Sequence, residues 1–201
     1  MTLRLWGSGL ALVLSGFAAG CTSVSSNYEG DITRADSARI VVCHGFDCTY
    51  KARLDLGAAD SRRLSSIMAG ARSAAAERAA VSRAVQYFEN RAAGAVGVRD
   101  QPKSDISQSR EKGQMDCIDE STNTRSLLLH LAHRKLLKHH TVEMNVSRGA
   151  FVDGRYPHST AVLRDKSGAR WAVDSWYAPM GGAPDIMPLP EWQSRGVMGQ
   201  Q

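Results

Sequence analysis

The chain has 201 residues, of which 43% are hydrophobic and 22% are charged, an ordinary composition for a globular protein. Its formal net charge is +5, and the basic residues stand beside acidic ones without a dense basic run. This pattern argues against nucleic acid as a partner.

The first 20 residues have the features of a secretory signal. Arg4 precedes an apolar run at 10–17 (LALVLSGF), and three small residues, at 18–20, come directly before Cys21. The apolar run is too short to span a membrane. We therefore expect residues 1–20 to be a signal peptide.

The cysteine after these small residues resembles the lipidation motif of bacterial lipoproteins, although Ala18 stands where that motif usually has leucine. The resemblance implies that Cys21 is diacylated, and more than one acyl chain gives stable membrane anchoring. Thr22 after the cysteine implies the periplasmic face of the outer membrane in a Gram-negative host. An ordinary cleaved signal with an incidental cysteine is the alternative. We expect a flexible tether over 21–37 and a single domain over 38–201.

Three cysteines remain after Cys21, and two of them are close in sequence. Residues 38–43 and 48–54 are typical of strands, and the four residues between them would place Cys43 opposite Cys48 in a hairpin. An oxidising compartment favours a disulfide between them. A metal or redox role for the pair is the alternative. Cys117 is then the odd thiol.

Helical periodicity is expected over 60–70 and 74–92, with the apolar residues of the second helix in the core. The polar stretch 99–113 predicts a long surface loop, for which we hypothesise a gating role beside the site. Strands are expected at 142–146, 157–164 and 170–177. The tail from Pro179 is rich in proline and glycine, so an irregular segment anchored by Trp192 is expected.

Cys117 is expected to open a helix that reaches about residue 138 and is buried through its leucines. Asp116 is a suitable N-cap, and Asp119 completes a pattern like a capping box. The N–H groups at a helix start can lower the pKa of a cysteine and hold an oxyanion. The nearby acids Asp116, Asp119 and Glu120 work against this by raising the thiol pKa.

His158 and Asp174 lie on the last two expected strands. A three-residue turn over 165–167 would pair Arg164 with Gly168, and in that register His158 lies directly opposite Asp174. An odd shift of register would put them on opposite faces. On the same face, the aspartate can fix the imidazole tautomer while the other ring nitrogen addresses a thiol.

The segments GQMDCIDE at 113–120, YPHSTAVL at 156–163 and RWAVDSW at 170–176 resemble the transglutaminase-like superfamily. The resemblance implies an α+β, papain-like fold in which the helix bearing the nucleophile packs on an antiparallel sheet. It implies Cys117 as nucleophile, His158 as general base and acid, and Asp174 as the residue that orients the histidine. Gln114 is a candidate oxyanion donor by analogy with papain-like enzymes, although its spacing from Cys117 is shorter.

The expected activity is that of a cysteine peptidase or amidase, or of an acyltransferase, acting on a peptide or peptidoglycan-type amide through a thioester. No cofactor or metal is expected. The alternatives are a non-catalytic envelope scaffold with this fold, and a zinc site at His130 and His133 near His139 and His140, for which the sequence supplies no adjacent acid or cysteine.

Overall fold

The computed structural model describes residues 38–103, 105–149 and 157–195. The expected signal peptide, Cys21 and the tether lie outside these residues. Among the described residues, none of the helices combines the length and the hydropathy needed to cross a bilayer.

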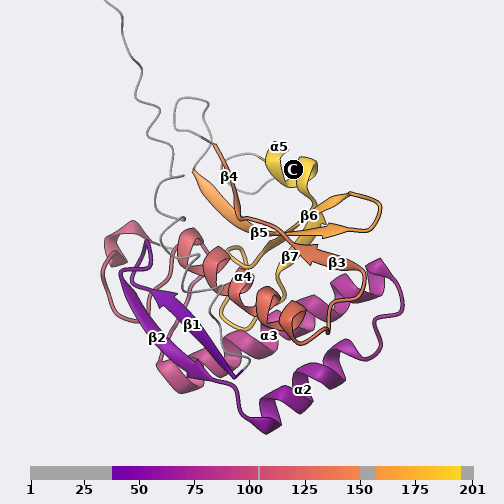
Figure 1. Cartoon of the computed structure of the whole chain (residues 1–201). Helices are drawn as coiled ribbons and strands as arrows, with labels where there is room; N and C mark the ends of the chain where they lie inside the picture. Colours follow the sequence, from indigo (N-terminus) through magenta and orange to yellow (C-terminus); the bar gives the residue numbers. More distant parts are fainter. Residues whose placement is uncertain (1–37, 104, 150–156, 196–201) are drawn as a thin grey trace, which may run out of the picture.

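The chain is α+β, as expected, and its helices and strands alternate in groups (Figure 1). In chain order they are β1 (Arg39–His44), β2 (Tyr50–Asp55), α2 (Ala58–Met68), α3 (Ala74–Val96), the 3₁₀ turn η1 (Ile106–Gln108), α4 (Cys117–His133), β3 (His140–Val142), β4 (Val146–Arg148), β5 (His158–Asp165), β6 (Arg170–Asp174), β7 (Asp185–Pro188) and α5 (Leu189–Ser194).

The main sheet is antiparallel and is built around β5. The short strands β3 and β4 both pair with one edge of β5, and β6 and then β7 follow on its other side. The single strand expected over 142–146 is therefore wrong, because the chain breaks there into two strands. The expected irregular tail is also wrong, since it forms β7 and α5.

Alternating side chains of β5 divide the core into two parts. Ala161 and Leu163 join the main cluster with α3 and α4, whereas Val162 joins a second cluster with Leu189 and Trp192 of α5. Figure 1 shows the resulting layers, with α5 on one side of the sheet and α4 on the other. Trp192 is fully buried, so its expected role as an anchor is confirmed.

The hairpin β1–β2 carries the Cys43–Cys48 disulfide, with Cα atoms 4.6 Å apart. The expected register is wrong, because Cys43 pairs with Lys51 and Cys48 lies in the connecting loop. Gly45, Phe46, Asp47 and Cys48 all have positive φ, which curls this loop tightly enough to bring the two sulfurs together.

Two helices end elsewhere than the sequence predicted. The helix expected to stop at residue 92 continues to Val96, where Gly97 in the left-handed conformation caps it. The helix expected to reach residue 138 stops at His133, and Lys135 turns the chain with φ 58°. Glu77 of α3 is buried and accepts the N–H groups of Lys138 and His139.

Helix α4 is buried between β1 and the sheet, and its polar half is as buried as its leucines. Residues 119–126 (DESTNTRS) are all buried. Asn123 shows how such a residue is accommodated: its amide accepts from the backbone N–H of Cys43 at 2.7 Å and donates to the carbonyl of Cys43 at 2.8 Å. This side chain joins α4 to the end of β1.

Replacing Asn123 with alanine tests this joint. Asn123→Ala leaves a buried N–H and a buried C=O of Cys43 unsatisfied, which should lower the free energy of unfolding by about 2–4 kcal/mol. Urea denaturation measures this loss. Asn90→Ala, which removes an exposed asparagine from α3, should cost less than about 1 kcal/mol; equal losses in the two variants would contradict the role assigned to Asn123.

Candidate active site

His158 and Asp174 form a buried pair at one end of the sheet. His158 Nε2 lies 2.7 Å from Asp174 Oδ2, and both side chains are about 2% exposed. An ionised carboxylate only accepts hydrogen bonds, so this contact places the ring proton on Nε2. His158 Nδ1 is buried and has no hydrogen-bond partner among the described residues. Asp174 therefore orients the imidazole through Nε2, and Nδ1 is left without a hydrogen bond among the described residues.

The register that brings these two residues together differs from the predicted one. The turn spans five residues, so Arg164 pairs with Arg170 and not with Gly168. This shift of two residues makes His158 and Asp174 diagonal neighbours, not directly opposed ones. Because side chains alternate with a period of two, an even shift keeps them on the same face. The predicted contact therefore survives the error in register.

Asp174 is also held by Trp192 and by the backbone. The indole Nε1 of Trp192 donates to Asp174 Oδ2 at 2.6 Å, and the N–H of Trp176 donates to Oδ1 at 3.2 Å. The ring of His158 packs near the same two tryptophans, at centroid distances of 4.5 Å from Trp176 and 5.6 Å from Trp192. From the sequence, Trp192 was expected only to anchor an irregular segment by packing.

Arg148 supports Trp192 in turn and was not identified from the sequence. Its guanidinium donates to the carbonyl of Trp192 and lies 4.4 Å from the centre of that indole ring. The β4–β5 register, in which Arg148 pairs with His158, sets its position. Arg148 lies beyond the strand expected over 142–146 and outside every motif, so no sequence pattern pointed to it.

Cys117 is the first residue of α4 and is half-buried. Asp116 is its N-cap and Asp119 completes the capping box, as predicted. The sulfur lies 4.0 Å from the carbonyl oxygen of Pro157, the residue immediately before His158. The structure therefore brings the start of α4 to the start of β5, at the end of the sheet where His158 and Asp174 meet.

The cap limits which helix N–H groups can serve an oxyanion. Asp116 Oδ1 accepts from the N–H groups of Ile118 at 3.1 Å and Asp119 at 2.9 Å, so both are occupied. The backbone of Gln114 is bonded to Gly45 at 2.6 Å and to Glu111 at 3.3 Å. These bonds fix the segment before Cys117, and the role of the Gln114 side chain stays a prediction.

Burial favours the neutral form of the acidic groups near Cys117, so these groups oppose a thiolate less than fully ionised carboxylates would. Burial raises the pKa of Asp116, and burial together with Asp116 raises the pKa of Asp119 to about 8. Asp119 also accepts the N–H groups of Phe46 at 2.8 Å and Cys48 at 2.7 Å. These carboxyl groups therefore hold the disulfide loop against the start of α4.

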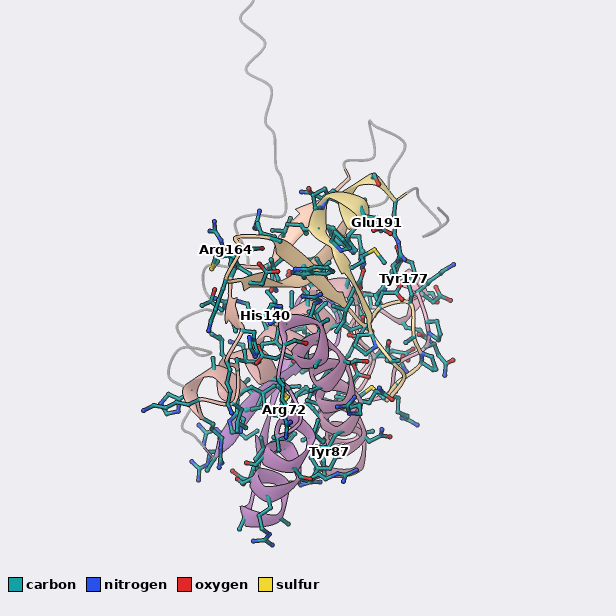
Figure 2. All side chains as sticks on the ribbon, turned by 90° about the vertical axis from the view of Figure 1, so that its right-hand side faces the viewer. Arg72, Tyr87, His140, Arg164, Tyr177 and Glu191 are labelled. Carbon is teal, nitrogen blue, oxygen red and sulfur yellow. A yellow bond between two sulfur atoms is a disulfide. The ribbon has the colours of Figure 1, made fainter. Side chains whose placement is uncertain are left out.

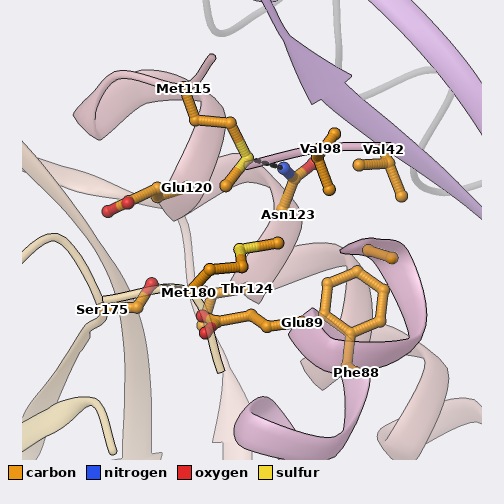
Figure 3. A pocket seen from close by; sticks show the side chains of 11 residues that line it. Val42, Phe88, Glu89, Val98, Met115, Glu120, Asn123, Thr124, Ser175 and Met180 are labelled. Atoms are coloured by element: carbon orange, nitrogen blue, oxygen red, sulfur yellow. Dashed lines mark hydrogen bonds between the residues drawn. The ribbon is translucent and has the colours of Figure 1, made fainter. Parts of the chain in front are cut away.

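A second group of buried acids lies under the site. Burial raises the pKa of Glu120 well above its usual value, and Glu120 shares a side-chain hydrogen bond with Asp100. Burial also raises the pKa of Glu89 to about 7. Hydrogen bonds from the N–H of Gly181 and the hydroxyl of Ser175 favour the ionised form but are outweighed by burial. Figure 3 shows Glu89 and Glu120 in the wall of a cavity of ≈ 10 Å³, enough for about one water molecule.

The predicted loop at 99–113 borders the site. It closes on itself through the Arg99 N–H and the Gly113 carbonyl at 2.6 Å, where a Cβ on residue 113 would lie 2.7 Å from the Gly97 oxygen. The N–H of Lys103 donates to the carbonyl of Trp176 at 3.0 Å. This contact attaches the loop to the residues around His158, and its gating role stays a prediction.

The histidines considered for zinc are separated. His130 is buried, with its pKa lowered by burial to about 4, whereas His133 is exposed and His140 pairs with Glu77 at 2.9 Å. Within the described part of the chain, potential metal donors converge only at Cys43, Cys48 and Asp119. The two sulfurs there are joined to each other.

Comparison of the chain with protein-family models, with curated proteins and with solved structures finds no match. The structure establishes an α+β architecture with an antiparallel sheet. Any catalytic function must therefore be inferred from Cys117, His158 and Asp174 at the end of that sheet.

The buried acids predict how stability depends on pH. Because the pKa of Glu89 rises from 4.5 to about 7 on folding, this group binds a proton on folding, and its own contribution to stability should fall by about 1–3 kcal/mol as the pH rises through this window. Glu89→Gln, which is always neutral, should remove this loss: the variant should match the parent at pH 5 and exceed it at pH 8. Urea denaturation at both pH values measures the difference. Glu111→Gln, at an exposed position, controls for net charge, and a stability difference between Glu89→Gln and the parent that does not grow from pH 5 to pH 8 would refute the prediction.

Proposed function

We propose that this chain is a lipid-anchored cysteine hydrolase of the cell envelope, a peptidase or amidase with a transglutaminase-like, papain-like fold. The observation that carries the proposal is the buried His158–Asp174 pair, which leaves Nδ1 unused at the end of the sheet where Cys117 opens α4. A nucleophile, a base and a group that orients the base are the three parts that covalent acyl transfer requires.

The mechanism follows from the proton on His158 Nε2. Asp174 holds that proton, so Nδ1 is the basic nitrogen and takes the proton of the Cys117 thiol. The thiolate attacks the carbonyl carbon of a peptide or peptidoglycan-type amide, and a tetrahedral intermediate forms. The imidazolium returns its proton to the leaving amine, and a thioester remains on Cys117. Water releases a carboxylic acid from it, whereas an amine acceptor gives a new amide.

Aromatic rings would support this chemistry by excluding water from the pair. Trp176 and Trp192 pack near the imidazole, and Asp174 is satisfied by donors from Trp176 and Trp192. A desolvated carboxylate interacts more strongly with an imidazolium than an exposed one does. The same contacts keep the imidazole plane fixed through the proton transfers.

A non-catalytic binding or scaffold module is the second candidate function. It is favoured by the cap of α4, because Asp116 occupies the N–H groups of Ile118 and Asp119 that would otherwise stabilise an oxyanion. The reactivity of Cys117 separates the two functions, since only an enzyme needs a thiolate at neutral pH.

The direct test is the pH dependence of Cys117 alkylation by chloroacetamide in the full chain, read by mass spectrometry of the peptide that contains Cys117. We expect labelling at pH 6.5 to be at least about tenfold faster than for an ordinary thiol of pKa about 8.5, and His158→Ala should abolish this excess. His133→Ala, at the exposed end of α4, should leave it unchanged. Ordinary thiol kinetics in the parent would favour the scaffold function instead.

Trp192→Phe tests whether the tryptophan positions the aspartate. The change keeps an aromatic ring but removes the N–H donated to Asp174, so the imidazolium should be stabilised less. We expect the midpoint of the pH profile of Cys117 labelling to move toward the ordinary thiol value. Trp171→Phe is the matched control, because its indole N–H donates to Asp165, away from the pair. A profile that moves equally in both variants, or in neither, would remove Trp192 from the site.

A further inference from the structure

Three cationic side chains converge on Tyr177, which adjoins the imidazole of His158. Lys103 Nζ lies 6.0 Å and the Arg195 guanidinium 5.6 Å from the centre of the tyrosine ring. Arg148 Nη2 donates to the phenol oxygen at 2.7 Å. The ring of Tyr177 meets that of His158 edge-on, with centroids 5.5 Å apart. Figure 2 shows Tyr177 on the α5 side of the molecule, with Glu191 of α5 above it.

Lys103, Arg148 and Arg195 lie around Tyr177, and two carboxylates oppose them: Asp174 acts electrostatically on the Tyr177 phenol and on Arg148, and Asp185 faces Arg195. Asp185 pairs with Arg195 Nη1 at 2.7 Å, and it is the one carboxylate that these three cations contact as an ion pair within the described residues. Arg148 Nη1 donates to the carbonyl oxygens of Trp192 and Arg195. Arg195 Nε is buried and has no hydrogen-bond partner among the described residues.

The three cationic side chains differ in how many of their donors are already hydrogen-bonded. Arg148 holds α5 in place and is mostly committed to that task. Lys103 is exposed, and its left-handed backbone, with φ 59°, is fixed by the bond from its N–H to Trp176. Lys103 thus has a fixed base and an ammonium group without an ion pair among the described residues, and Arg195 has a buried Nε–H donor without a partner among them. Such donors bind carboxylates through charge-assisted hydrogen bonds.

We propose that Lys103 and Arg195, which both lie against the ring of Tyr177, form a subsite for a carboxylate group of the acyl substrate. This inference rests on the proposed function, because it makes the substrate of Cys117 an acidic peptide. The carboxylate can belong to an aspartate or glutamate side chain or to a free chain terminus. In both cases the charge guides the amide toward the thiol next to His158.

The experiment compares pairs of chloroacetyl peptides that differ only in one charge. In each reagent the thiolate of Cys117 displaces chloride and a thioether forms. The side-chain pair is chloroacetyl-Ala-Glu-amide and chloroacetyl-Ala-Gln-amide, and the terminal pair is chloroacetyl-Ala-Ala with a free carboxylate and with an amide. The full chain is used, and labelling is read at Cys117. The measured quantity is the ratio of the acidic to the neutral rate within each pair.

We expect a ratio above one in at least one pair, and the pair that shows it identifies the source of the carboxylate. Lys103→Gln and Arg195→Gln should each lower that ratio by about two- to fivefold, the range of a single partly exposed charge, and 1 M salt should do the same. Lys135→Gln is the matched control, because Lys135 is also exposed and left-handed, with φ 58°, and lies about 25 Å from Cys117 along α4. Its ratio should equal that of the parent.

Ratios at or below one in both pairs, or ratios that do not change in Lys103→Gln and Arg195→Gln, would overturn the subsite. The uncharged reagent chloroacetamide reports on the proposed function separately. Fast labelling by chloroacetamide with no preference for the acidic peptides rejects the carboxylate subsite and keeps the Cys–His pair. Slow labelling by chloroacetamide at neutral pH rejects the enzyme itself.

Discussion

The structure depends on hydrogen bonds to most of the buried polar side chains of α4, with Glu120 Oε2 and the two ring nitrogens of His130 as exceptions among the described residues. A helix that packs β1 on one side and the sheet on the other cannot leave its side chains in water, yet residues 119–126 are all polar. Burying such groups without hydrogen bonds would cost several kcal/mol. Each neighbouring element supplies partners instead: the disulfide loop to Asp119, the end of β1 to Asn123 and the start of β5 to Ser121. These bonds fix the direction and depth of the helix.

The same bonds position Cys117. Because Asp116 and Asp119 bind both the helix N–H groups and the loop at 45–48, the start of α4 cannot rotate or fray independently. The far side of the site is fixed by a series of contacts from Arg148 to Trp192, then to Asp174 and finally to His158. The thiol and the imidazole thus belong to two separately supported halves that meet at Pro157.

Several local features could be predicted because each depends on neighbours in the sequence. The N-cap at Asp116, the Cys43–Cys48 bridge and the same-face relation of His158 and Asp174 follow from short-range geometry. The predictions failed where distant contacts override local preference. Helix α4 stops at His133 because the carboxylate of Glu77 binds the backbone at 138–139, and the proline-rich tail is ordered because Trp192 fills the space under the sheet.

The sequence by itself determined the residue types of the site, the α+β class and the alternation that puts His158 and Asp174 on one face. Only the tertiary structure decided which other groups join them. Trp192 and Arg148 come from segments with no periodic signal, and Lys103 and Arg195, which are 92 residues apart in the sequence, both reach Tyr177. The physical reason is the range of the interactions. Caps and strand alternation act between residues close in sequence, whereas a buried polar group takes any partner that the fold brings within about 3 Å.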